Sequence, residues 1–344
     1  MRRAGRWLVF AALAGLVTAA GALALLEWDW HTPFSPAGGE RMVTVTKGMR
    51  AGQVLELMAH EGVVRSRVSL KLAFALKGRP RSLRAGSYRF DHPLTPLQVV
   101  DKLNRGDVIY TKVTVPEGLR LDEVAHLLAE AGLGKEGTFL RIMNRGNLVA
   151  DVDPQATALE GYLFPDTYLV DPGRSEESVI EMFVKGLHQW WESHASEAGG
   201  RSLREVVTLG SLVEKETGAP EERGLIAGVF ANRLKVGMPL QTDPSIVYAE
   251  MVSGAYRGFL TREDWTYPSP YNTYQHPGLP PGPICSPGRA ALEAALRPSP
   301  SPYLYFVSRN DGTHAFSRTL SEHNEAVSRY QKNGGRRGTP GGRQ

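Results

Sequence analysis

Residues 202–218, which read SLREVVTLGSLVEKETG, form a largely apolar segment that ends in two carboxylates. Successive residues of a helix are about 100° apart, so Glu214 falls within one apolar stripe and Glu216 falls beside two leucines. The stripe comprises Leu203, Val206, Val207, Gly210 and Val213, and the leucines are Leu209 and Leu212. Burying carboxylates at the end of such a helix is costly and needs a reason.

Glu214 and Glu216 are therefore the first catalytic candidates. Apolar surroundings raise the pKa of a carboxyl group, which allows a glutamic acid to donate a proton near neutral pH. Because the two residues are two positions apart, their side chains point in well separated directions, and we expect at most one to be the donor. The alternative is that both are helix-end charges that pair with Lys215 or Arg223, and the helix alone does not decide between these interpretations.

The N-terminus carries a predicted membrane anchor. Trp7–Leu26 is a run of twenty uncharged, mostly apolar residues, which as a helix spans roughly 30 Å, the thickness of a bilayer core. The flanking charges are Arg2, Arg3 and Arg6 before the run and Glu27 and Asp29 after it. The positive-inside rule then predicts a single-pass protein of the cell inner (cytoplasmic) membrane with a cytoplasmic N-terminus and an extracytoplasmic body. The alternative is a signal peptide cleaved within 19–24, but the apolar run exceeds its usual length.

Composition limits the function classes. The 344 residues are 42% hydrophobic, enough for one large or two ordinary cores. The net charge of +4 comes from seven positive residues at the two ends, so the body is slightly acidic and nucleic acid is not an expected partner. The single Cys285 excludes an intramolecular disulfide. The nine histidines lack the paired spacing of metal ligands, His314 and His323 are interpreted as surface or strand residues, and no cofactor is expected.

The expected fold class is α+β, with an N-terminal transmembrane helix, a small α+β module and a larger mixed α/β domain. The predicted boundaries are a cytoplasmic tip and anchor at 1–27, a tether at 28–40, the module at 41–110, the larger domain at 111–332 and a disordered tail at 333–344.

Periodicity and turn signals predict the individual elements. In the module, strands are expected at 42–46 and 86–90 and helices at 51–61, 66–76 and 96–104. In the larger domain, strands are expected at 112–115, 303–308 and 313–317, and helices at 121–131, 138–144, 225–234, 289–296 and in a last segment through 330. Thr319 and Glu322 match a capping box for that last helix. Residues 266–287 are a long loop rich in Pro, Gly and Tyr, which makes Tyr271, Asn272 and Tyr274 candidates for lining a groove.

Four strings combine aromatic, amide and carboxylate side chains: LEGYLFPDTY (159–168), VEKET (213–217), LQTDP (240–244) and YNTY (271–274). The chain has no G-x-S-x-G motif and no phosphate-binding loop, so a serine hydrolase or nucleotide enzyme is not favoured. Sugar rings stack on aromatic faces, and their hydroxyl and acetamido groups need neutral donors and acceptors. The strings therefore favour a glycan as substrate.

The ordered strings also resemble the YceG-like (MltG) family of membrane-anchored endolytic murein transglycosylases, and the resemblance covers nearly the whole chain. It rests on the anchor, EGYLFPDTY, VEKET, GVFANRLKVGMPLQTDPSIVYA, YNTYQHPGLPPGPICSPG and PYLYFVSRNDGTHAFSRTLSEHN. It implies that the small module is LysM-like and that the larger domain is a lytic transglycosylase domain with lysozyme-like active-site elements.

The resemblance implies cleavage of peptidoglycan strands between N-acetylmuramic acid and N-acetylglucosamine without water, which leaves a 1,6-anhydro end. Glu216 matches the second Glu of the family's EKET and is implied to be the catalytic acid and base. Thr217 after it resembles the Glu-Ser pair of lysozyme-like transglycosylases. Such a reaction needs one carboxylate, whereas glycoside hydrolases use two.

The remaining candidates have weaker assignments. Gln241 resembles a glutamine near the sugar in lysozyme-like transglycosylases, and Tyr271 and Asn272 resemble their Tyr-Asn pair. For these three, contact with substrate and scaffolding of a loop are both open. Asp243, before a proline, is either a substrate contact or a turn residue.

Two further glutamates are interpreted as supports. Glu160 either lines the groove or holds the loop around Phe164 and Pro165, and a supporting role is favoured. Glu214 is interpreted either as a residue that supports the site from behind or as structural. His276 and Cys285 receive no role.

The expected partners are peptidoglycan strands and, through the family association, peptidoglycan synthases or the elongation and division machinery, where the enzyme would terminate nascent strands. Two alternatives stay open. One is a muramidase that uses water, with Asp166, Asp243 or Glu160 as its second carboxylate. The other is a non-catalytic wall-binding scaffold, which is favoured if replacing Glu216 by Gln changes nothing.

Overall fold

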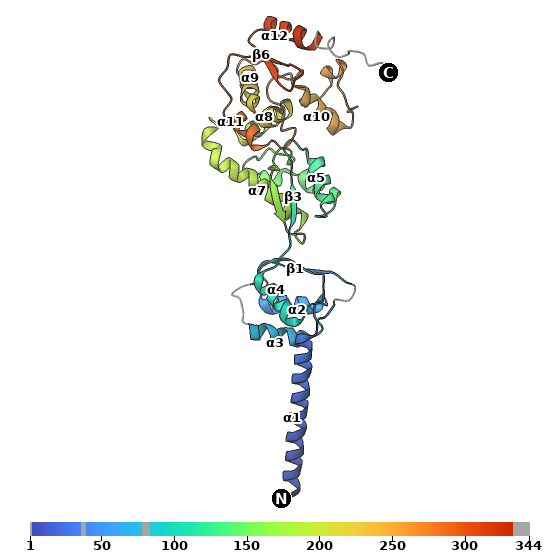
Figure 1. Cartoon of the computed structure of the whole chain (residues 1–344). Coiled ribbons are helices and arrows are strands. Elements are labelled where there is room, and N and C mark those ends of the chain that lie inside the picture. The colour runs from blue at the N-terminus through green and yellow to red at the C-terminus, as the bar shows by residue number, and fades with distance from the viewer. Residues whose placement is uncertain (1, 36–38, 78–82, 333–344) are drawn as a thin grey trace, which may run out of the picture. The chain divides into compact units, whose positions relative to one another are not determined.

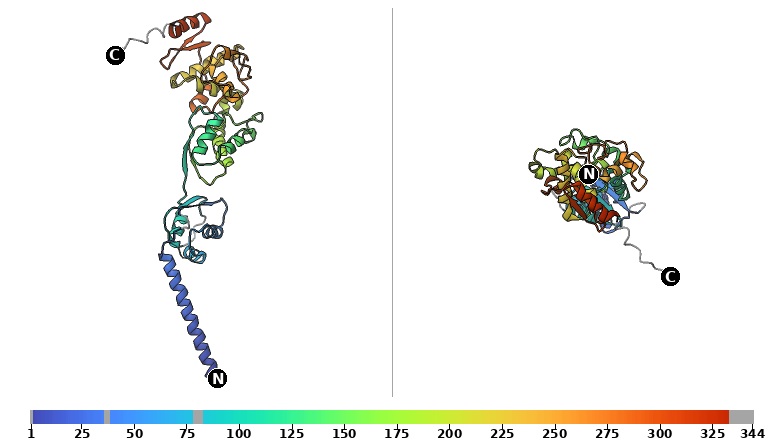
Figure 2. Two further views of the ribbon diagram at one scale, coloured as in Figure 1. Left: turned by 90° about the vertical axis from the view of Figure 1, so that its right-hand side faces the viewer. Right: turned by 90° about the horizontal axis from the view of Figure 1, so that it is seen from above.

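The computed structural model describes residues 2–35, 39–77 and 83–332, which fall into two compact units (Figures 1 and 2). The first unit comprises Met1–Thr111 and Leu169–Gly173, and the second Lys112–Tyr168 and Arg174–Gln344. The predicted disordered tail, 333–344, lies outside the described residues. The units are a mixture of helices and three two-stranded sheets.

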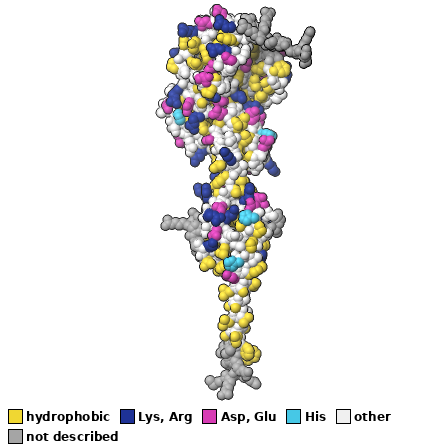
Figure 3. Space-filling view, viewed as in Figure 1, with side chains coloured by type: hydrophobic (Ala, Val, Ile, Leu, Met, Phe, Trp, Pro, Cys, Tyr) yellow, Lys and Arg dark blue, Asp and Glu magenta, His cyan; other side chains and the backbone are white. Residues whose placement is uncertain are grey.

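The first unit begins with helix α1 (Arg2–His31). Its segment Phe10–His31 is long and apolar enough to cross a membrane, and none of its most apolar 18-residue window is buried; apolar side chains cover this helix in Figure 3. The helix continues through residues 28–31, which the sequence had assigned to the tether. No Gly or Pro interrupts it there, and Trp30 Nε1 donates a hydrogen bond to Ser69 O (3.1 Å). The C-terminal end of α1 therefore packs on its own unit.

A small α+β module completes the first unit, and its predicted elements are confirmed to within two residues. Strands β1 (Arg41–Val45) and β2 (Gly86–Phe90) pair antiparallel, with Val43 opposite Tyr88. The helices are α2 (Ala51–His60), α3 (Arg67–Lys77) and α4 (Pro96–Arg105). Tyr88 is fully buried among the apolar faces of these helices, so one core holds the module together.

The chain beyond the module contains two further two-stranded sheets and most of the helices. The strands are β3 (Thr111–Thr114) paired with β4 (Thr167–Val170), and β5 (Tyr305–Ser308) paired antiparallel with β6 (His314–Ser317). The helices are α5 (Leu121–Glu130), α6 (Glu136–Met143), α7 (Glu176–His194), α8 (Leu203–Glu216), α9 (Arg223–Lys235), α10 (Asp243–Ser253), α11 (Arg289–Leu296) and α12 (Leu320–Val327). The predicted capping box of Thr319 and Glu322 is confirmed at the start of α12.

Helix α8 is the centre of the second unit. It contacts α9, α10 and α11, and every residue of 206–213 is buried, so its apolar residues face neighbours on all sides. Gly210 allows the closest approach, because a Cβ there would lie 3.3 Å from the Leu292 side chain on α11. Ser202 and Glu205 form a capping box that fixes where the helix begins.

The sequence analysis did not identify α7, α10 and β4. Helix α7 is the longest helix of the second unit, with Ser175 as its N-cap and Glu176 and Glu177 in its first turn. Helix α10 begins at Asp243, with Pro244 in its first turn, a pattern that also fits a turn. The loop predicted at 266–287 is confirmed, since no helix or strand lies within 267–287.

Candidate active site

Helix α8 ends at Glu216 because Thr217 adopts an extended conformation (φ −142°, ψ 137°). The Thr217 hydroxyl accepts a hydrogen bond from Ala219 N (2.9 Å), which stabilises the turn away from the helix. The Glu216 side chain lies in the wall of a cavity of about 380 Å³. The other walls come from α9, from residues 240–243 at the start of α10, from the segment 265–274, from the β5–β6 hairpin and from α12. The helix end thus presents one carboxyl group to a cavity built from distant segments.

The Glu216 carboxyl group is present in both its protonated and its ionised form near neutral pH. The pKa of Glu216 is raised to about 7: burial is the main cause and the nearby charge of Asp243 adds to it, against a hydrogen bond from Thr242 and the charge of Arg233, which lower the pKa. Thr242 donates that hydrogen bond through Oγ1 to Glu216 Oε1. A carboxyl group with a pKa near neutrality can donate a proton and take one back at little cost.

The loop before α10 is held in place by Thr273. Gln241 N donates to Thr273 O (3.2 Å), and Thr242 N donates to Thr273 Oγ1 (3.0 Å). These bonds keep Gln241 in the left-handed region (φ 48°), a conformation that costs a non-glycine residue about 1–2 kcal/mol. The Gln241 side chain lines the cavity. The strained loop therefore delivers both the Thr242 hydroxyl and the Gln241 amide to the neighbourhood of Glu216.

An aromatic wall faces the same cavity. Trp265 and Tyr274 are stacked, with ring centroids 5.6 Å apart and planes 6° from parallel. Tyr274 Oη donates to Asp243 Oδ1 (2.6 Å), so Asp243, which also lines the cavity, is not a free carboxylate. Aromatic faces next to amide and carboxylate oxygens are suited to sugar rings and their hydroxyls.

Asn272 organises this wall from behind. The residue is fully buried, its Nδ2 donates to Trp265 O (3.2 Å) and Tyr267 O (2.9 Å), and its Oδ1 accepts from Tyr274 N (3.0 Å). Every polar atom of its amide group is thus used within the loop. Asn272 positions Trp265 and Tyr274 and does not line the cavity.

Arg233 is a cavity residue that the sequence analysis did not single out. Its side chain is buried, and it donates to Leu304 O (2.6 Å) and Leu240 O (2.6 Å). Its guanidinium lies over the Tyr305 ring (5.3 Å). Thr242 and Trp265 were also missed. Thr242 lies inside the LQTDP string, which is the one signal that pointed to it, whereas nothing in the local sequence shows that Arg233 is buried.

The other predicted residues do not join this cavity. Tyr271 packs against Tyr248 at a centroid distance of 4.9 Å. Glu160 Oε2 accepts from Tyr248 Oη (3.3 Å) and Leu121 N (3.5 Å). Glu160 Oε1 is buried and has no hydrogen-bond partner among the residues that the structure describes, and burial is the main reason that the pKa of Glu160 is raised to about 8. Glu214 Oε2 accepts from Gly288 N (3.0 Å). These three residues tie elements of the unit together at places away from the Glu216 cavity.

The two residues without a predicted role differ in exposure. Cys285 is buried, and its Sγ donates to Ser211 O (3.5 Å), so it packs against α8. His276 is exposed. Within residues 2–35, 39–77 and 83–332, no three histidine, cysteine or carboxylate side chains are grouped as metal ligands.

Comparisons with known proteins all indicate similarity to YceG-like proteins and endolytic murein transglycosylases. The sequence model of the YceG-like family matches residues 43–329. An endolytic murein transglycosylase of Bacillus subtilis (strain 168) is 33% identical over 307 residues, covering 84% of each chain. One of Streptococcus pneumoniae (serotype 2, strain D39) is 31% identical over 279 residues, which are 72% of this chain and 51% of the pneumococcal protein. A crystal structure of a YceG-like protein from Listeria monocytogenes matches with a TM-score of 0.57 at 31% identity, over 83% of this chain and 98% of that chain.

Proposed function

The chain belongs to the YceG-like family and is a peptidoglycan lytic transglycosylase, and from the geometry of its cavity we propose that Glu216 is the single acid and base of the reaction. The observation that supports this role is a carboxyl group with a pKa of about 7 in the wall of a cavity that also carries stacked aromatic rings. An acid of that pKa is protonated in a large fraction of molecules at neutral pH.

In the first step, protonated Glu216 donates its proton to the oxygen of the bond between N-acetylmuramic acid and N-acetylglucosamine. The bond from C1 to that oxygen breaks, and positive charge develops at C1 and the ring oxygen. The Glu216 carboxylate formed at this moment stabilises that charge. The Thr242 hydroxyl and the Arg233 guanidinium favour the ionised form of Glu216, so they stabilise the enzyme between the two proton transfers.

In the second step, Glu216 takes the proton of the 6-hydroxyl of the muramoyl residue while that oxygen bonds to C1. The product is a 1,6-anhydro end, Glu216 is protonated again, and no water is consumed. Proton donation and return by one group explains why a second carboxylate is not needed. Trp265 and Tyr274 are proposed to stack on the sugar rings, and Gln241 to bind a hydroxyl or acetamido group.

A hydrolytic muramidase is the alternative reaction. Of the three carboxylates considered for it, Asp243 lines the Glu216 cavity, whereas Asp166 and Glu160 do not. Asp243 is engaged by Tyr274, which favours a positioning role over activation of a water molecule.

The location and architecture of the enzyme are part of the proposal. We propose that α1 crosses the cytoplasmic membrane once, with the N-terminus inside and the remainder outside, supported by its exposed apolar surface and by the arginines before it. The module at 41–110 is proposed to be LysM-like and to position the enzyme on the wall. The catalytic domain is proposed to be 111–332, with lysozyme-like site elements, acting with peptidoglycan synthases or the elongation and division machinery to terminate strands.

The test is mass spectrometry of glycan strands digested by the full-length protein in detergent. The expected products carry 1,6-anhydromuramoyl ends that disappear with Glu216→Gln. Glu214→Gln is a matched control on the same helix and should keep them. Reducing ends would establish a hydrolase, to be followed by Asp243→Asn, and strands left intact by folded wild-type protein would favour a wall-binding scaffold.

A further inference from the structure

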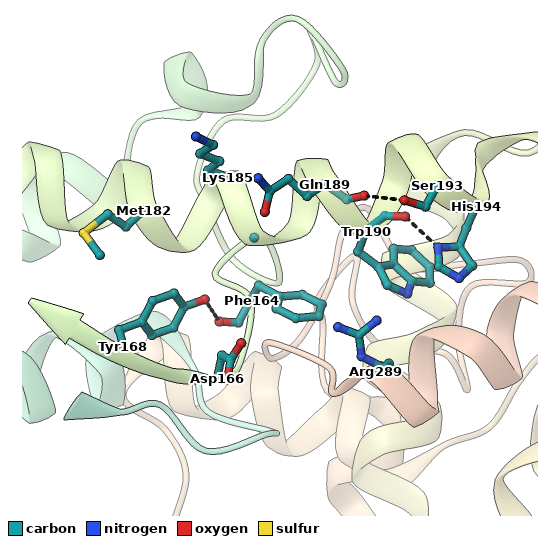
Figure 4. A pocket seen from close by; sticks show the side chains of 11 residues that line it. Phe164, Asp166, Tyr168, Met182, Lys185, Gln189, Trp190, Ser193, His194 and Arg289 are labelled. Carbon is teal, nitrogen blue, oxygen red and sulfur yellow. Dashed lines mark hydrogen bonds between the residues drawn. The ribbon is translucent and has the colours of Figure 1, made fainter. Parts of the chain in front are cut away.

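A second cavity, of about 550 Å³, lies in the second unit and shares no residue with the Glu216 cavity (Figure 4). One side is the exposed face of α7, and the other is the segment 164–168 that leads into β4. Arg289, the first residue of α11, closes one end. The proposed mechanism uses none of these residues.

The cavity is lined by side chains with hydrogen-bond donors that no other described residue accepts from. Trp190 Nε1 is buried and has no partner among the described residues, and in Figure 4 it lies on the side of the indole ring toward Arg289. Leaving a buried N–H group unpaired costs about 1–3 kcal/mol. The Arg289 guanidinium lies over the Phe164 ring (5.4 Å). For Arg289 and Lys185, no ion pair is found within residues 2–35, 39–77 and 83–332.

The walls around these donors are firmly packed. Gly186 allows α7 to approach the loop, because a Cβ there would lie 3.1 Å from Phe164 Cβ and 3.1 Å from Tyr168 Oη. His194 stacks on Trp190 (4.8 Å, 16°), and its Nδ1 is hydrogen-bonded to Trp190 O (2.7 Å). The indole ring that carries the unpaired N–H group is therefore held in one orientation before any ligand arrives.

The charges of the cavity favour an anion. Arg289 and Lys185 are its two cations, and Asp166 is its one carboxylate. Asp166 Oδ1 already accepts a hydrogen bond from Thr167 N (2.6 Å). A planar guanidinium beside an N–H donor binds a carboxylate well, because the two oxygens can accept from both groups.

We propose that this cavity binds a carboxylate of the peptide stems carried by peptidoglycan strands. The inference rests on the proposed function, since the glycan that enters the Glu216 cavity brings short peptides with free carboxylates. The two cavities are linked through α8, because Glu214 accepts a hydrogen bond from Gly288 N and Arg289 follows directly. A stem held by Arg289 therefore anchors the strand close to the helix end that carries Glu216.

The test is a binding measurement with the full-length protein in detergent, carrying Glu216→Gln so that strands stay intact. Two strand preparations of equal length are compared, one with stems and one stripped of them by an amidase. Strands with stems should bind about tenfold more tightly, the size of one charge-assisted hydrogen bond. Arg289→Gln should bring this ratio close to one without weakening binding of stripped strands, and Trp190→Phe, which removes the donor but keeps a ring, should reduce it in part.

Arg141→Gln is the matched control, because Arg141 is exposed on α6 outside the cavity and the ratio should stay at its original value. Strands whose stem carboxylates are amidated should bind like stripped strands if the carboxylate is the recognised group. An unchanged ratio in Arg289→Gln, or equal binding of both preparations by the parent protein, would overturn the inference alone. If the parent protein binds neither the strands with stems nor the stripped strands, both the proposed function and the inference are overturned.

Discussion

The end of α8 around Glu216 and the loop around Glu160 both hold a half-buried glutamic acid with a raised pKa, yet they differ in what surrounds it. Burial raises both pKa values, to about 7 for Glu216 and about 8 for Glu160. Each carboxyl group also accepts a hydrogen bond from a hydroxyl, that of Thr242 or that of Tyr248. Glu216 lies in the wall of a cavity, whereas Glu160 does not line that cavity and joins α10 to the start of α5. A raised pKa thus identifies a partly buried acid, and access to substrate separates a catalytic acid from a structural one.

The largest expected effect comes from removing the acid at the accessible position. Glu216→Gln should lower kcat/KM by about 10³-fold or more, since general acid–base catalysis contributes about 10²–10⁴. Glutamine still accepts the Thr242 hydrogen bond, so at pH 4, where Glu216 is mostly protonated in both the folded and the unfolded state, the unfolding midpoint in urea should stay close to that of wild type. Rates of anhydromuramoyl formation check the first expectation. A loss of similar size in Glu160→Gln would remove the distinction between the two regions.

The pH dependence of cleavage should follow Glu216 and not Glu160. The form that donates is protonated, so kcat/KM should fall as the pH rises through about 7 and then decline about tenfold per pH unit, or roughly 100-fold by pH 9. Rates measured from pH 5 to 9 in wild type and in Glu160→Gln check this. The variant should keep the same alkaline limb, that is, the same fall of kcat/KM as the pH rises through about 7. A limb that moves or vanishes in Glu160→Gln would identify Glu160 as the titrating acid.

Removing the hydroxyl group that donates to the carboxyl should change the kinetics at Glu216 but not when the group removed is the partner of Glu160. The Thr242 hydrogen bond lowers the pKa of Glu216, so Thr242→Val should move the limb to higher pH. It should also reduce the plateau rate about tenfold, because the carboxyl group loses the bond that orients it. Tyr248→Phe, which removes the corresponding partner of Glu160, is the matched control and should leave both features as they are. An unmoved limb in Thr242→Val would contradict the proposed coupling.

The smallest effect on activity is expected at Glu160, where the change is one of stability. Both folded and unfolded states hold the proton below the ordinary value of 4.5, and above it the unfolded state releases the proton while the folded state keeps it until about 8. Wild type should therefore lose stability relative to Glu160→Gln between pH 4.5 and 8, by roughly 1.4 kcal/mol for each unit of pKa difference. Urea unfolding at pH 4 and pH 8 measures this, and rates should stay within about threefold. If the difference in unfolding free energy between wild type and Glu160→Gln is the same at pH 4 and pH 8, Glu160 is not protonated in the folded state.

Local sequence patterns predicted most elements of the fold. The strand at 86–90 and the helix at 289–296 have the predicted bounds, because alternation, helical spacing and the following Pro298 are signals contained in a few neighbouring residues. Helix α10 was missed, since Asp243 and Pro244 suit the first turn of a helix as well as a loop.

The candidate site was predicted less completely than the fold. Tyr271, Asn272 and Tyr274 were grouped as possible groove residues, yet Tyr274 lines the cavity, Asn272 is buried behind it, and Tyr271 packs on Tyr248. A loop without periodicity gives no sequence signal for the direction of its side chains. Arg233 was missed for a related reason, because an arginine on a helix is usually exposed.

The sequence by itself determined the apolar helix at 203–216, the apolar N-terminal segment and, through its ordered strings, the family. Tertiary structure alone decided which of the two glutamates with raised pKa values lines the cavity. Thr242, Arg233 and Trp265 lie 17 to 49 positions after Glu216 in the chain and on different elements. The pKa and accessibility of a carboxyl group depend on such neighbours in space, which periodicity along the chain does not encode.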